Sequence, residues 1–116
     1  LNANLYGVTH REIVLAAFTA CCHKKEDINP LDWARYKDIL REEDIEIVKR
    51  LGVMLRIAES LDRSMSGCIK GINCDILGDS VIMKTEVEGD ASLEIRDAMA
   101  AGAEFKKSFH KNLEIL

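Results

Sequence analysis

The chain has 116 residues, of which 47% are apolar and 31% are charged, a composition typical of one globular domain with a hydrophobic core. Its formal net charge is −4, which excludes the strongly basic surface of a general nucleic-acid-binding protein. No apolar run approaches the ~18 residues that a membrane span needs. We therefore expect neither a nucleic-acid partner nor a membrane partner.

The N-terminal part of the chain predicts helices. Because the chain begins with Leu1 rather than Met, we expect a piece of a longer polypeptide. Residues 9–12, Thr-His-Arg-Glu, have the form of a capping box, which predicts that a helix begins there. The helix is expected to end near residues 23–25, because His and Lys suit a helix C-terminus.

A second, longer helix is expected in the middle of the chain. Pro30, the only proline, suits the first position of a short segment over residues 31–40. The acidic residues of 41–44 favour the start of a helix that runs to about Arg63. Apolar residues recur along it at three- and four-residue steps and draw one stripe. The stripe consists of Val48, Leu51, Leu55, Ala58 and Leu61.

The pattern changes after Gly67. Ile69, Ile72 and the run 74–77 look like one strand and residues 81–87 look like a second, with Gly78-Asp79 as a hairpin signal between them. Residues 91–109 return to helical spacing, and 112–116 can add a short final strand beside the hairpin. The apolar positions of this last helix are Leu93, Ala98, Ala101, Phe105 and Phe109.

These elements predict an α+β fold with a helical portion over residues 1–67 and a small ββαβ unit over residues 68–116. The first portion carries ten Lys and Arg against eleven Asp and Glu, and the second carries six against nine. Neither portion therefore has a basic excess. A polyanion that binds here needs a local patch of cations.

The four cysteines show no C-x-x-C pair and no zinc spacing. We therefore expect Cys21, Cys22, Cys68 and Cys74 to be reduced, buried thiols of a cytoplasmic protein. The chain has no glycine-rich nucleotide loop and no serine nucleophile elbow. The three histidines never fall four apart, so no H-E-x-x-H metal site can form. No catalytic residue and no metal ligand is therefore assigned.

Two groups of cations are candidates for binding phosphate. Arg56, Glu59 and Arg63 are spaced to share one helix face, which can hold a phosphate or form a solvated ladder of ion pairs. His23, Lys24 and Lys25 can contact phosphate or simply end the first helix. The residues alone leave both alternatives open.

Two motifs resemble the C-terminal region of the Ppx/GppA family, the exopolyphosphatases and guanosine pentaphosphate phosphohydrolases. Residues 7–25 resemble the family's helix start followed by "LAAxxxxxH(R/K)K", and residues 55–67 match "LRxAxxLDRSxxG". The resemblance covers essentially the whole chain and implies an HD-like helical part. It places His23 at a late HD histidine and Glu59 at the last metal-binding Asp, while the His-Asp dyad would lie before Leu1.

The resemblance implies a function for the parent protein and a lesser one for this segment. Phosphoanhydride hydrolysis would be carried out, with Mg²⁺, by two N-terminal actin-like domains that are absent here. This segment would be a non-catalytic accessory domain that forms a homodimer through its helices. It would hold polyphosphate or guanosine pentaphosphate through Arg56, Arg63, His23, Lys24 and Lys25. The alternatives are a structural or regulatory dimerisation module and, less favoured, a fragment of an HD-type metal phosphohydrolase.

Overall fold

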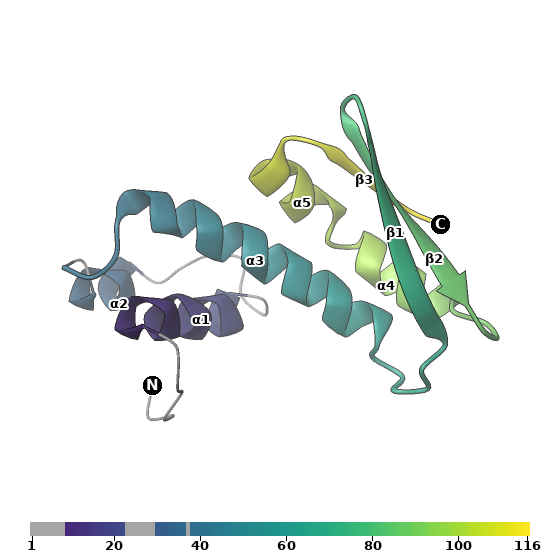
Figure 1. The fold of residues 1–116 in the computed structure, drawn as a ribbon, viewed down its shortest axis with the longest axis horizontal. Helices are drawn as coiled ribbons and strands as arrows, with labels where there is room; N and C mark the ends of the chain where they lie inside the picture. Colours follow the sequence, from purple (N-terminus) through teal and green to yellow (C-terminus); the bar gives the residue numbers. More distant parts are fainter. Residues whose placement is uncertain (1–8, 23–29, 37) are drawn as a thin grey trace. The chain divides into compact units, whose positions relative to one another are not determined.

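The computed structural model describes residues 9–22, 30–36 and 38–116 (Figure 1). The chain forms two compact units, Leu1–Gly52 and Val53–Leu116, and the long helix α3 (Glu42–Leu61) contributes to both. Helices and a small mixed sheet together give the expected α+β class. None of the helices in the described ranges is long and apolar enough to cross a membrane.

The first unit contains α1 (His10–Cys22), α2 (Pro30–Arg35) and the first half of α3. The Thr9 half of the predicted capping box is confirmed at α1, where the amide of Glu12 donates to Thr9 Oγ1 at 3.2 Å. Pro30 is the first residue of α2, as its fixed φ and missing N–H favour. The first unit has a small core of four buried side chains, with three partly buried aromatic side chains packed against them. It consists of Val14, Leu15, Leu40 and Val48, packed by Phe18, Trp33 and Tyr36.

The second unit begins within α3 and contains the sheet. Strands β1 (Ile69–Leu77) and β2 (Ser80–Val87) form an antiparallel hairpin (Figure 1). The two residues between them confirm the predicted turn, with Gly78 at a φ of +57° that a side chain rarely adopts. The final strand β3 (Asn112–Ile115) lies parallel to β2, so the strand order is β1-β2-β3.

The predicted helix over residues 91–109 is two helices, α4 (Ser92–Met99) and α5 (Gly102–Phe109). The break falls at Ala100 and Ala101, whose amides bond three residues back to Asp97 and Ala98 rather than four. Helix propensity alone does not place the break, because alanine favours a helix and only Gly102 disfavours one. Ala98 and Ala101 are both fully buried at the break. The unit is therefore ββααβ rather than ββαβ.

The core of the second unit lies between α3, α4 and α5 and one face of the sheet. It is built from nine buried residues: Val53, Ile57, Leu61, Val81, Ala98, Ala101, Phe105, Leu113 and Ile115. Phe105 stacks on Phe109 with ring centroids 4.6 Å apart. Leu93, an apolar position of the predicted helix, is instead 71% exposed.

The apolar stripe read from the sequence of α3 is buried only at its ends, Val48 and Leu61. In the C-terminal half of the helix, Val53 and Ile57 are buried in its place. A helix with apolar residues on more than one side gives no sequence signal for which side meets its neighbours. Four large apolar side chains therefore remain 41% to 52% exposed along α3: Ile47, Leu51, Met54 and Leu55.

Candidate functional site

Two of the five predicted phosphate contacts, Arg56 and Arg63, lie in the second unit. Arg56 lies on α3 next to the buried Ile57, and its own side chain is partly buried. Across the residues that the structure describes, no hydrogen bond or ion pair engages the Arg56 guanidinium. The other three residues, His23, Lys24 and Lys25, lie outside the described residues.

Arg63 lies just beyond the C-terminus of α3, in an exposed turn. Its Nη1 donates to Oδ2 of Asp97 on α4 at 3.3 Å. The two side chains are 61% and 46% exposed, and ion pairs between such exposed groups contribute only about 0–1 kcal/mol. Arg63 can therefore exchange Asp97 for another anion at small cost.

The turn after α3 is defined by a backbone hydrogen bond and by two residues with positive φ. The amide of Met65 donates to the carbonyl of Asp62 at 2.9 Å, and Met65 itself has a φ of +53°. The hydroxyls of Ser64 and Ser66 lie 2.8 Å apart, and Gly67 follows with a φ of +66°. Residues 62–64 therefore follow the end of α3 and do not continue the helix. The same turn holds Arg63 at the surface.

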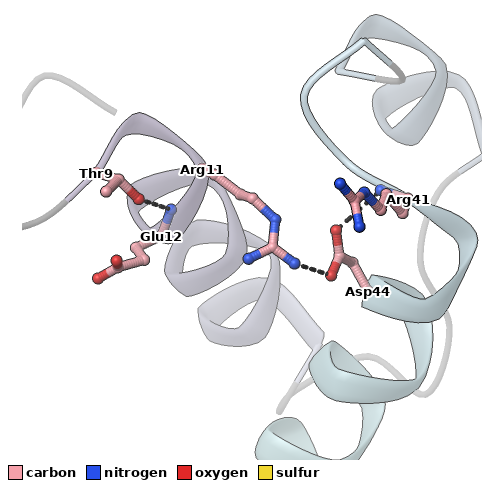
Figure 2. Close-up of polar contacts among 5 residues, drawn as sticks. All are labelled: Thr9, Arg11, Glu12, Arg41 and Asp44. Atoms are coloured by element: carbon pink, nitrogen blue, oxygen red, sulfur yellow. Dashed lines mark hydrogen bonds and ion pairs between the residues drawn. The ribbon is translucent and has the colours of Figure 1, made fainter.

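Asp44 is a buried carboxylate that the sequence did not single out (Figure 2). It lies in the first turn of α3, where its Oδ2 accepts the backbone N–H of Arg41 at 2.8 Å and its Oδ1 pairs with Arg11 of α1. The bond from the Arg41 amide and the pairing with Arg11 hold the pKa of Asp44 below its usual value, although burial acts in the opposite direction. From the sequence, Asp44 was readable only as one of the acidic residues of 41–44 that favour the start of a helix, and not as a buried carboxylate.

The contacts of Asp44 connect α1 to the beginning of α3 and do not form a reaction site. Each carboxylate oxygen accepts a hydrogen bond and Asp44 is buried, so the carboxylate is not open to a substrate. In the part of the chain that is described, no three His, Cys, Asp or Glu side chains gather closely enough to hold a metal ion. We therefore derive no metal-dependent step from these residues.

One of the two described thiols differs from the expectation that all the cysteines are buried. Cys68 is buried and free, as predicted, but Cys74 on β1 is free and exposed. The side chains of Cys21 and Cys22 lie outside the described set. Cys74 is exposed because it lies on the edge strand β1, in the stretch of that strand that contributes no side chain to the core.

Comparison with known proteins adds no family. No protein-family model matches the chain, and no curated protein matches it.

Proposed function

We propose that this chain is the C-terminal accessory domain of an exopolyphosphatase-like phosphohydrolase, with an HD-like helical part. It helps to hold a polyphosphate chain and to form a homodimer in the cytoplasm. Hydrolysis of the phosphoanhydride belongs to N-terminal actin-like domains of the parent, which use Mg²⁺. The motif over residues 55–67, on α3 and the turn that follows it, is the main sequence support.

The observation that carries the phosphate part is the state of the two arginines in that motif. Arg56 is not tied by any described partner, and Arg63 is held only by the exposed pair with Asp97. A guanidinium presents several N–H donors in a planar fork that matches phosphate oxygens. In-line attack of water on a terminal phosphate also needs a positioned base and charge neutralisation. This segment would supply only positive charge along the substrate.

The test is binding of polyphosphate of defined length to the full chain and to the double variant Arg56→Ala/Arg63→Ala. We expect binding to weaken about tenfold, which requires about 0.7 kcal/mol from each of the two arginines, and to become less sensitive to salt. The matched control is Lys106→Ala/Lys107→Ala, which removes the same charge from the exposed surface of α5. Equal loss in both double variants would mean that net charge alone drives binding, and the proposal would fail.

A specific observation favours the non-catalytic dimerisation module as the second candidate. The exposed apolar stripe on α3, Ile47, Leu51, Met54 and Leu55, is of the kind that a second helix covers. In that case the chain would self-associate equally well with and without polyphosphate. Sedimentation at several protein concentrations, with and without polyphosphate, distinguishes the two candidates.

A further inference from the structure

β1 is an edge strand whose outer backbone groups are unpaired within the described chain. On β2, the amide of Thr85 donates to the carbonyl of Leu116, and the carbonyl of Met83 accepts from the amide of Leu116, each at 2.9 Å. The backbone groups of Thr85 and Met83 therefore face away from β1. Backbone bonding direction alternates along a strand, so β2 residues 80, 82 and 84 bond to β1. Their register partners are residues 77, 75 and 73. The backbone of Ile72, Cys74 and Ile76 consequently faces the open edge.

The same three residues expose their side chains. Ile72, Cys74 and Ile76 pair with Thr85, Met83 and Val81, so they lie on the face of the sheet that carries the core. Val81 is buried under the helices, whereas Ile76 opposite it is 67% exposed. Ile72 is also exposed. The helices therefore cover β2, β3 and the beginning of β1 at Ile69, and leave residues 72–77 of β1 uncovered.

The open edge carries little that prevents another strand from pairing with it. Natural edge strands are commonly protected by proline, bulges or charged side chains. The only proline of the chain is Pro30, and the bulge of β1 lies at its beginning, between Ile69 and Gly71. From residue 71 to residue 77 the one charged side chain is Asp75, which is paired with Lys84 on β2 at 3.2 Å.

We propose that β1 pairs antiparallel with β1 of a second copy of this chain, with Cys74 opposite Cys74 of that copy. This register sets Ile72 of each chain opposite Ile76 of the other, and these are the residues whose backbone groups face outward. On the opposite face Asn73 meets Asp75, where an amide N–H can donate to a carboxylate. Apolar pairs and hydrogen-bonding pairs both stabilise adjacent strands.

The neighbouring registers are less favourable. Moving the two-fold axis to Asp75 sets two carboxylates directly opposite each other. Moving it to Asn73 sets Lys70 of the bulge opposite Ile76 and separates the two isoleucines. Only the register centred on Cys74 matches every outward residue with a similar one on an identical chain. This self-match is the reason for assigning a second copy rather than an unrelated strand.

The proposal rests on the dimerisation part of the proposed function, moves the dimer contact from the helices to β1, and uses nothing from the phosphate part. Its first test is disulfide cross-linking of the full chain in a background with Cys21→Ser, Cys22→Ser and Cys68→Ala. Mild oxidation should link two chains through Cys74, since opposite residues at hydrogen-bonded positions have Cα atoms about 5.5 Å apart, within disulfide range. With Cys74→Ser added, Ile72→Cys and Ile76→Cys chains should link when mixed and not separately. Equal linking of each variant with itself would overturn the register.

The second test is sedimentation of the full chain. Ile76→Lys should raise the dimer Kd at least tenfold while leaving the thermal midpoint unchanged, because the side chain contacts little within its own chain. The matched control Leu93→Lys, on an equally exposed residue of α4, should leave the Kd unchanged. A monomer at all concentrations, or a dimer lost with Met54→Lys on α3 and kept with Ile76→Lys, would overturn the proposal. Polyphosphate binding by Ile76→Lys then shows separately whether the phosphate part holds.

Discussion

Two neighbouring residues of α3, Leu55 and Ile57, distinguish the helix face indicated by the sequence from the face that is buried. The apolar stripe read from the sequence includes Leu55 and omits Ile57. In the structure Ile57 is 3% exposed and Leu55 is 41% exposed. Both residues belong to the second unit, and alanine suits a helix at either position. The variants Ile57→Ala and Leu55→Ala therefore differ mainly in how much buried side chain they remove, while the change in helix propensity is nearly the same.

The expected magnitudes follow from the buried fraction. Truncating either side chain to alanine removes three carbon groups, each worth about 0.8 kcal/mol when fully buried. For Ile57 this gives about 2.4 kcal/mol, and the cavity left among the core residues raises the loss to about 3 kcal/mol. For Leu55 about three-fifths of the transfer term applies and solvent fills the space, so the loss is about 1.4 kcal/mol. The difference of about 1.6 kcal/mol corresponds to about a fifteenfold difference in the unfolding equilibrium.

The assay is urea unfolding of the full chain followed by far-UV circular dichroism, at a protein concentration where sedimentation shows one species. Unchanged slopes with a shifted midpoint would mean that stability itself has changed. Trp33, the only tryptophan, lies in the first unit, so its fluorescence follows that unit in the same samples. An equal or larger loss in Leu55→Ala would refute the assignment of the buried face.

Two further predictions concern the charged residues. Asp44 has a lowered pKa, so its stabilising contribution is present above the usual carboxyl range and is lost as the pH falls below about 4. In Asp44→Asn, unfolding of the first unit, followed by Trp33 fluorescence, should therefore depend less on pH below about 4. An unchanged acid profile in this variant would contradict the role of Asp44. Asp97→Asn removes the carboxylate that competes for Arg63, so polyphosphate should bind severalfold more tightly with almost no change in thermal midpoint, measured by titration and by thermal unfolding. Weaker binding in Asp97→Asn would mean that Asp97 orients Arg63 instead of competing for it.

The candidate site shows how far the sequence reaches. The seven-residue spacing of Arg56 and Arg63 was readable from the chain, although α3 ends at Leu61 and Arg63 lies in the turn beyond it rather than on the expected helix face. The partner of Arg63 was not, since Asp97 is 34 residues away and belongs to a different helix. The same holds for Asp44 and Arg11, which are 33 residues apart.

The sequence by itself determined the elements whose signals are local. The cap at Thr9, the proline that begins α2 and the glycine turn between β1 and β2 each act within about four residues. Tertiary structure alone decided which side of α3 is buried, where the last helix breaks, and that β1 is left at the edge of the sheet. The physical reason is that burial depends on which distant surfaces meet, and a hydrophobic side chain packs equally well against any apolar neighbour of suitable shape.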